Sequence, residues 1–370
     1  MSTPSDGRPL RVVAKIGTSS LTDDRGHIAR AAIQKLTGEI ADLRRAGHEV
    51  LLVSSGAVAA GLATLGFDSR PSDVLTLQAV SAVGQTRIMR VYNDELAEHG
   101  LVGAQVLVDP HDFVNRRQYL HARSTLSRLL ELGCVPIINE NDTIASDELR
   151  YGDNDRISAL VAHAMRADVL VLLTDLDGLY TADPRTDPTA RLVTTVTADD
   201  PLLAINATSG GSGRGSGGMS SKLTAARIAS WSGVRTVIAR ASREGVLSGA
   251  VAGEPVGTTF ASHDRWLPAR KLWIAFAAEV TGTIVVDPGA RRALTERGVS
   301  LLPAGVRAVE GDFAEGDTVA VADEDGVVFA RGMVFATAAQ IRAAAGKHTR
   351  DLPDGMVPEV VHRDDLVVLG

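Results

Sequence analysis

Short apolar runs alternate with longer segments of helical periodicity over the first two thirds of the chain. The runs predict buried strands at 11–16, 49–53, 101–108, 136–138, 169–173 and 234–239. The periodic segments predict helices at 29–46, 58–65, 73–99, 116–132 and 156–166, and a further helix that begins at Lys222. Because strands rich in Val and Leu alternate with helices, the pattern predicts an α/β fold with a mostly parallel sheet covered on both faces.

The pattern changes after about residue 270. Short strands are predicted at 283–286, 318–321 and 327–329, with acidic and glycine-containing turns between them, and one helix at 289–297. We therefore predict two domains. The first covers residues 1–262, a linker covers 263–278, and a small β-rich domain covers 279–370.

Composition narrows the class of protein. The chain has 370 residues, and its aromatic content of 4% leaves the core to Val, Leu, Ile and Ala. The one cysteine, Cys134, excludes an internal disulfide framework and suits a reducing compartment. The first residues have no apolar segment typical of a secretion signal, and no run of about 18 apolar residues occurs. We therefore expect a cytoplasmic protein that does not cross a membrane.

Charge is unevenly distributed along the chain. The net charge is −7, and residues 275–370 contribute −6 of it, with 9 Lys and Arg against 15 Asp and Glu. Such an acidic tail argues against RNA binding, because phosphate contacts supply most nucleic-acid affinity.

Lysine is rare in this chain. Of 38 basic residues, only five are lysine. They are Lys15, Lys35, Lys222, Lys271 and Lys347. An ammonium is a compact point charge, which suits a crowded position beside a phosphoryl group better than a planar guanidinium. Some of these lysines are thus candidates for a phosphate-handling site, although chance retention accounts for about half of them.

Two strand ends carry candidate anion-binding groups. Lys15 comes one residue before the end of its strand and is followed by a Gly-Thr-Ser-Ser turn rich in hydrogen-bond donors. The second strand runs into Ser54-Ser55-Gly56-Ala57 and a helix, whose free N–H groups and positive end favour an anion. The alternatives are a lysine at a sheet edge with its ammonium in water and an ordinary βα turn.

Residues 136–155 form a polar stretch that follows a strand and precedes a helix. Carboxylates and amides at this density are costly to bury without partners. In α/β folds this edge of the sheet is where ligands bind. A polar surface loop in which Asn154 or Asp155 caps the following helix explains the stretch equally well.

Residues 206–221 are the most glycine-dense segment. Gly213 to Gly218 match G-x-G-x-x-G, but the match comes late and follows a loop, so it is not a dinucleotide fingerprint. The P-loop signature and the D-F-G motif of protein kinases are absent from the sequence, and the H-R-D at 362–364 lacks the L-x-x-x-N that follows it in a kinase catalytic loop. Glycines before a helix that carries Lys222 nevertheless have the ingredients of a phosphate cradle. The alternative is a flexible surface loop.

Six motifs together resemble one family. They are KIGTS (15–19), SGA (55–57), INEND (138–142), GDND (152–155), LLTDLDGLY (172–180) and SGGMSSK (216–222). In this order they closely resemble the glutamate 5-kinases (γ-glutamyl kinases), a branch of the amino-acid kinase family, over almost the whole chain. The tail resembles the PUA domain.

The resemblance implies a fold and an activity. The fold is the three-layer αβα sandwich of the amino-acid kinases with a PUA-like β-rich domain. The reaction is transfer of the ATP γ-phosphoryl group to the γ-carboxylate of L-glutamate, the first step of proline biosynthesis. The resemblance also implies a Mg²⁺ requirement, feedback inhibition by L-proline, and a homo-oligomer, either a dimer or a tetramer.

Site residues follow from the same resemblance. The catalytic positions are Lys15, Lys222 and Asp155, and the substrate positions are Ser55, Gly56, Asp142 and Asn154. The ATP positions are Lys15, Thr174, Asp175, Ser216, Gly217, Gly218, Met219, Ser220, Ser221 and Lys222. Ser216 and Ser221 replace threonines that are common in the family and keep the hydroxyl. Metal ligands are not assigned.

From the chemistry of these groups, we expect Asp155 to hold the two lysines and Asp142 to bind the substrate's ammonium. We expect Ser55, with its helix N-terminus, to bind a substrate carboxylate.

Three alternatives remain. Another acceptor of the same family, such as acetylglutamate, aspartate, carbamate or a nucleoside monophosphate, would use similar motifs. An RNA-binding role would use the tail, and a regulatory module without catalysis would make the lysines incidental.

Overall fold

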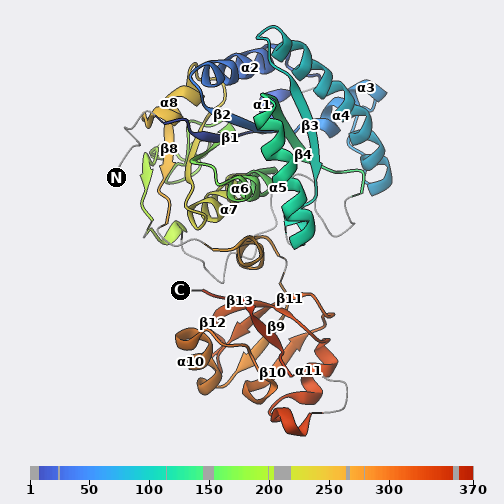
Figure 1. Cartoon of the computed structure of the whole chain (residues 1–370), viewed down its shortest axis with the longest axis vertical. Coiled ribbons are helices and arrows are strands. Elements are labelled where there is room, and N and C mark those ends of the chain that lie inside the picture. Colours follow the sequence, from blue (N-terminus) through green and yellow to red (C-terminus); the bar gives the residue numbers. More distant parts are fainter. Residues whose placement is uncertain are drawn as a thin grey trace. The chain divides into compact units, whose positions relative to one another are not determined.

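The computed structural model describes residues 8–23, 26–113, 115–144, 154–198, 200–203, 218–263, 267–278, 280–352 and 358–369. These residues divide into two compact units (Figure 1). The first unit holds the described residues up to 203 and from 218 to 263, and the second begins at residue 267. Each unit buries an apolar core of its own.

The first unit is built on an eight-stranded sheet with the order β3-β4-β2-β1-β5-β7-β8-β6. The strands are β1 (Arg11–Ile16), β2 (Glu49–Val53), β3 (Gly103–Val108), β4 (Val135–Glu140), β5 (Val169–Thr174), β6 (Thr195–Val196), β7 (Arg235–Arg240) and β8 (Gly257–Phe260). Within the described residues, β7 and β8 pair antiparallel and the other neighbours pair parallel. The predicted mostly parallel sheet is confirmed.

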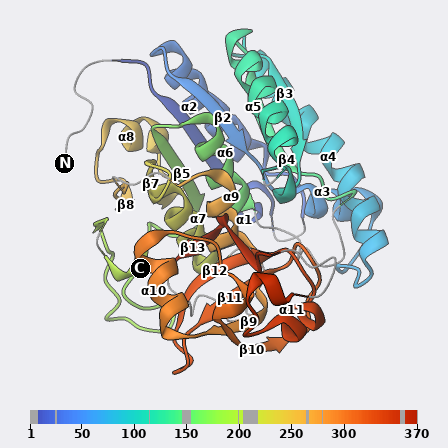
Figure 2. The same cartoon turned by 60° about the horizontal axis from the view of Figure 1, so that its bottom comes forward.

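Helices cover both faces of this sheet (Figures 1 and 2). One layer holds α2 (Arg30–Arg45), α4 (Val74–Ala97) and α8 (Val246–Ala252), with α3 (Ala57–Leu65) packed on α4. The other layer holds α5 (Arg116–Glu131), α6 (Asn154–Met165) and α7 (Met219–Ser230). Shorter pieces are α1 (Thr18–Leu21), η1 (Pro110–Phe113) and η2 (Pro201–Leu203). This is the predicted three-layer αβα sandwich.

The strand directions bring the predicted site segments to one edge. Lys15 of β1 lies in register with Val53 of β2 on one side and Leu172 of β5 on the other. Parallel strands end at the same edge of a sheet, so the segments that follow β1, β2, β4 and β5 meet there. This edge carries the cavity described below.

Two glycines allow α3 and α4 to pack with their backbones in contact. A Cβ on Gly84 of α4 would lie 1.7 Å from the carbonyl oxygen of Ala57, and one on Gly61 of α3 would lie 2.0 Å from that of Val80. A real Cβ cannot approach a carbonyl this closely. Gly56, the residue before α3, has φ +94°, a conformation that glycine adopts without strain. The close packing of α3 on α4 therefore requires glycine at positions 61 and 84.

The second unit is a five-stranded sheet in the order β10-β9-β11-β12-β13. The strands are β9 (Val280–Val286), β10 (Val306–Gly311), β11 (Thr318–Ala322), β12 (Val328–Val334) and β13 (Val361–Val368). The pairing of β9 with β11 is parallel and the others are antiparallel. Helices α10 (Pro288–Arg297) and α11 (Ala338–Ala344) complete it, with η4 (Pro303–Gly305) and η5 (Thr349–Asp351). The predicted small β-rich unit is present.

Residues of the predicted linker are partly helical. Helix α9 (Ala269–Leu272) and the π-helical η3 (Trp273–Ala277) contact β13, and η3 also contacts β12. The buried guanidinium of Arg331 donates a hydrogen bond to the carbonyl of Ala275 at 2.9 Å. These helical turns thus pack within the second unit. The domain bounds 1–262 and 279–370 stay predictions.

Three of the element ends that differ from the sequence prediction carry residues of the site described below. Strand β4 continues through Asn139 to Glu140 instead of ending at Ile138, and all its residues are buried. Helix α6 begins at Asn154, so Asn154 and Asp155 lie in its first turn rather than before it. Helix α7 begins at Met219, which puts Lys222 one turn inside the helix. In β4 and α6 polar side chains continue the element because they find buried partners, and in α7 Ser221 bonds the buried Asp155.

Several elements were not predicted. They include β6, β8, β10, β13, α8, α9 and α11, and also α1, which forms where a turn was expected. No helix in the described part of the chain has the length and apolar character needed to span a membrane.

Candidate active site

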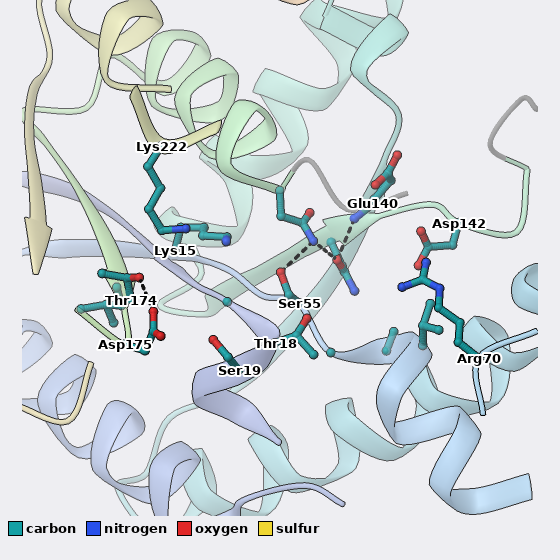
Figure 3. A pocket seen from close by; sticks show the side chains of 17 residues that line it. Lys15, Thr18, Ser19, Ser55, Arg70, Glu140, Asp142, Thr174, Asp175 and Lys222 are labelled. Atoms are coloured by element: carbon teal, nitrogen blue, oxygen red, sulfur yellow. Dashed lines mark hydrogen bonds between the residues drawn. The ribbon is translucent and has the colours of Figure 1, made fainter. Parts of the chain in front are cut away.

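A cavity of about 320 Å³ opens at the carboxyl edge of the first sheet (Figure 3). Its walls come from the ends of β1, β2, β4 and β5 and from the starts of α1, α3, α6 and α7. The lining residues are Lys15, Gly17, Thr18, Ser19, Ser55, Gly56, Ala57, Val58, Arg70, Asn139, Glu140, Asp142, Asn154, Leu173, Thr174, Asp175 and Lys222.

One buried carboxylate joins two lysines that are far apart in sequence. Lys15 Nζ lies 2.8 Å from Asp155 Oδ1, and Lys222 Nζ lies 3.2 Å from Asp155 Oδ2. The Ser221 hydroxyl donates a third bond to Oδ2 at 2.6 Å. Asp155 is 1% exposed and the lysines are 4% and 5% exposed. The structure thus brings together the three residues predicted to be catalytic.

The charges of this triad settle the ionisation of Asp155. Burial alone would raise its pKa, but the ammonium groups of Lys15 and Lys222 lower it below the ordinary value. Two ammonium groups against one carboxylate leave an excess positive charge at the cavity wall. Such a wall favours an anionic ligand.

A chain of amides connects the middle of the cavity to α4. Asn154 Nδ2 donates to Ser55 Oγ at 3.1 Å and to Asn139 Oδ1 at 2.9 Å. Asn139 Nδ2 in turn donates to Gln85 Oε1 at 2.7 Å. Asn154 Oδ1 is buried and has no hydrogen-bond partner among the described residues. An acceptor left open in this way fits a ligand with an N–H donor.

Asp142 stands at the other end of the cavity from the lysines, beside Arg70 (Figure 3). It is 9% exposed, and the Ser81 hydroxyl of α4 donates to its Oδ2 at 2.5 Å. Burial raises the pKa of Asp142, while the Ser81 hydrogen bond and the positive charge of Arg70 act against the rise. A carboxylate held in this way can bind an ammonium.

The end of β5 forms the third part of the site. Thr174 donates from its hydroxyl to Asp175 Oδ1 at 3.1 Å, and Arg185 pairs with Asp175 Oδ2 at 2.7 Å. Next to them, Arg240 of β7 forms a bidentate salt bridge with Asp177. Thr174 and Asp175 line the cavity, and the nucleotide-binding role predicted for them stays a prediction.

The predicted glycine segment is only partly described. Ser216 and Gly217 lie outside the described residues. Gly218 precedes α7, and Met219 and Ser220 open it without lining the cavity. The binding roles predicted for these five residues stay predictions.

Arg70, Ser81 and Gln85 were missed by the sequence analysis. Ser81 and Gln85 lie one turn apart on the buried face of α4, among apolar neighbours. Polar residues on an otherwise apolar helix face were the available signal. Arg70 is one of many arginines, and the sequence does not set it apart.

The fold and this site define a class. Residues 10–240 match the model of the amino acid kinase family, and residues 282–356 match that of the PUA domain. Carbamate kinase from Giardia lamblia, solved bound to AMP-PNP, shares the fold with a TM-score of 0.50 and 16% identity, covering 70% of this chain and all of that one.

Closer relatives narrow the class further. The chain is 48% identical to a glutamate 5-kinase of Thermobifida fusca, with 97% of this chain and 93% of that protein covered. It is 47% identical to a glutamate 5-kinase of Chromohalobacter salexigens, with 98% and 97% covered. The chain belongs to the glutamate 5-kinase branch of the amino acid kinase family. The resemblance stated from the motifs is confirmed.

Proposed function

We propose that this protein transfers the γ-phosphoryl group of ATP to the γ-carboxylate of L-glutamate, forming L-glutamyl 5-phosphate, the first step of proline biosynthesis. The observation that carries the proposal is the arrangement of charges along one cavity. Two lysines held by Asp155 stand at one end and Asp142 at the other. These charges complement an acceptor with a carboxylate at one end and an ammonium at the other.

The chemistry needs no general base. The γ-carboxyl group has an ordinary pKa near 4.3 and is already ionised at neutral pH. One of its oxygens attacks the γ-phosphorus, the bond to the bridging oxygen breaks, and ADP leaves with the electron pair. Catalysis of such a transfer is mostly positioning and charge stabilisation. Lys15 and Lys222 would reduce the repulsion between the two anions and stabilise the charge that develops in the transition state.

The cavity offers partners for the acceptor. The α-ammonium is the only strong donor of glutamate, so it suits both Asp142 and the open Oδ1 of Asn154. Ser55, which precedes the N-terminus of α3, lies between Asp142 and the lysines (Figure 3), and it suits the γ-carboxylate together with Gly56, which also lines the cavity. We propose these contacts for substrate binding.

The nucleotide would lie along β5 and the start of α7. Thr174, Asp175 and the backbone N–H groups at the N-terminus of α7, residues 218–221, are the candidate contacts. Mg²⁺ would enter with ATP and shield its phosphates. The described residues contain no group of three or more potential metal-ligating side chains, and Mg²⁺ usually takes substrate phosphates and waters as ligands. We propose that the phosphates supply most of its coordination.

Two regulatory properties are proposed from the resemblance. L-Proline would inhibit the enzyme, and the chain would form a homo-oligomer. A proline titration of the initial rate and light scattering of the purified protein test these two proposals separately.

An acceptor panel tests the function. Purified protein would be incubated with MgATP and, separately, with L-glutamate, N-acetylglutamate, aspartate, carbamate and UMP, and ADP release would be measured. We expect glutamate to be preferred, and hydroxylamine to trap its acyl phosphate as a hydroxamate. A preference for another acceptor would overturn the glutamate assignment, and no turnover with any acceptor would overturn the kinase assignment.

A further inference from the structure

Arg70 lies at the end of the cavity that faces away from the lysines. It is exposed and belongs to the segment between α3 and α4. Its side chain points toward Asp142, and both residues line the cavity (Figure 3). The charge of Arg70 acts on the Asp142 carboxylate and lowers its pKa against the effect of burial. Arg70 therefore contributes to the electrostatics of the acceptor end.

Three cationic side chains line the cavity in the described residues: Lys15, Lys222 and Arg70. The two lysines are held by Asp155 at the phosphoryl end. Arg70 is thus the cation beside Asp142. An arginine has five N–H donors in a planar fork, so it can act on Asp142 and hold a second carboxylate at the same time.

A bound amino acid presents two opposite charges at its α-carbon. Asp142 satisfies the ammonium, but the α-carboxylate would otherwise face an anionic neighbour. A carboxylate next to Asp142 without a cation would be repelled. An adjacent Arg–Asp pair is complementary to both α groups at once.

We propose that Arg70 binds the α-carboxylate of the acceptor and makes the enzyme selective for acceptors that carry one. This inference rests on the proposed function and deepens it. Arg70 and Asp142 together form the α-group clamp, which fixes the acceptor so that its γ-carboxylate reaches the lysines. Ser55 and the N-terminus of α3 then bind the γ-carboxylate rather than the α-carboxylate.

The test pairs a protein change with a substrate change. L-Isoglutamine has the γ-carboxylate and ammonium of glutamate, but an amide in place of the α-carboxylate. Its kcat/KM and that of glutamate would be measured with the wild type and with Arg70→Gln; where isoglutamine turns over too slowly, its inhibition constant against glutamate replaces kcat/KM. We expect the wild type to prefer glutamate by roughly 10- to 100-fold, the range for a charged hydrogen bond, and Arg70→Gln to lose most of that preference.

The substitution should reduce kcat/KM for glutamate and leave kcat/KM for isoglutamine unchanged. In Arg70→Gln the KM for glutamate should rise by a similar factor, while the KM for ATP and the value for isoglutamine stay within about twofold. Arg70→Lys keeps the positive charge but lacks the planar guanidinium, so its preference for glutamate should lie between those of the wild type and Arg70→Gln. Arg90→Gln on α4, an exposed arginine outside the cavity lining, is the matched control and should behave as wild type.

Two results would overturn the role of Arg70 and leave the kinase assignment standing. One is an unchanged preference for glutamate in Arg70→Gln. The other is an equal loss for both acceptors that disappears at higher pH, which would mean that Arg70 acts only by keeping Asp142 ionised. A wild type that does not phosphorylate glutamate would overturn the proposed function itself, and the α-group clamp with it.

Discussion

Lys15, Lys222 and Ser221 share one carboxylate, so their positions are set before any substrate arrives. Lys222→Ala should lower kcat by roughly 10²–10³, the usual scale for the loss of one donor to the transition state. Steady-state rates at saturating ATP and glutamate would measure this. Lys347→Ala, an exposed lysine of the second unit, is the control. Turnover of Lys222→Ala near the wild-type rate would remove Lys222 from the mechanism.

Asp142 should make glutamate binding sensitive to acid. Its pKa is raised above the ordinary 3.8, so its ionised form is lost as the pH falls through a value higher than that of a free aspartate. The KM for glutamate should therefore rise on acidification while the KM for ATP changes little. Ser81→Ala removes a hydrogen bond that lowers this pKa, and should move the rise to higher pH.

Asp142→Asn is the complementary variant. It should have a high KM for glutamate at neutral pH and keep only the substrate's own titration near 4.3. A pH profile of kcat/KM for each protein would show this. If Asp142→Asn kept the wild-type profile, another group would be responsible for it.

Among single residues, the sequence predicts those that stand out by their rarity or by their place in a motif. Lys15 and Lys222 were set apart because lysine is rare, and Asp142, Asn154 and Asp155 because polar residues gather in one stretch. Arg70 was not predicted, since its role depends on which carboxylate the fold places beside it. Local sequence carries no information on such a pairing across more than 70 residues.

Among the elements, the contact of α3 with α4 makes the clearest prediction. Gly84→Ala puts a methyl group against the carbonyl of Ala57, and should destabilise the first unit by about 1–3 kcal/mol, the usual cost of overpacking. Because Ala57 opens α3, activity should fall as well. Thermal or urea unfolding together with the KM for glutamate would measure both effects.

Gly38→Ala on α2 is the matched control. The nearest side-chain atom to its added methyl would be 3.9 Å away, so it should be neutral or slightly stabilising, as alanine usually is in a helix. Equal effects of the two substitutions would contradict the packing argument.

Elements were predictable where periodicity was strong. Strands β1 and β2 match their predicted bounds, and most of the long helices match within a few residues. The predicted strand ended before β4 does, because Asn139 and Glu140 look like the end of an apolar run. The partners that allow their burial, such as Gln85, come from a helix distant in the sequence. Short elements such as β8 depend on pairing with β7 rather than on local pattern.

For the whole molecule, two separate cores predict two unfolding steps. An ATP analogue at about 100 times its dissociation constant should stabilise the first unit by about 2.7 kcal/mol and leave the second unchanged. Calorimetry with and without ligands would measure this. Val319→Ala, a substitution in the core of the second unit, should lower the unfolding temperature of that unit alone. A single transition that responds to both changes would show that the units unfold together.

The bridge from Lys15 to Lys222 through Asp155 also has a consequence during protein synthesis. Its members come from the first strand and from α7, near the end of the first unit. At roughly 5–20 residues per second, about 10–40 s pass between the synthesis of Lys15 and that of Lys222. In that interval a growing chain lacks Lys222, one member of the proposed phosphoryl site, so ATP binding at that site cannot yet assist folding. Ligand stabilisation is available only to chains whose first unit has left the ribosome almost entirely.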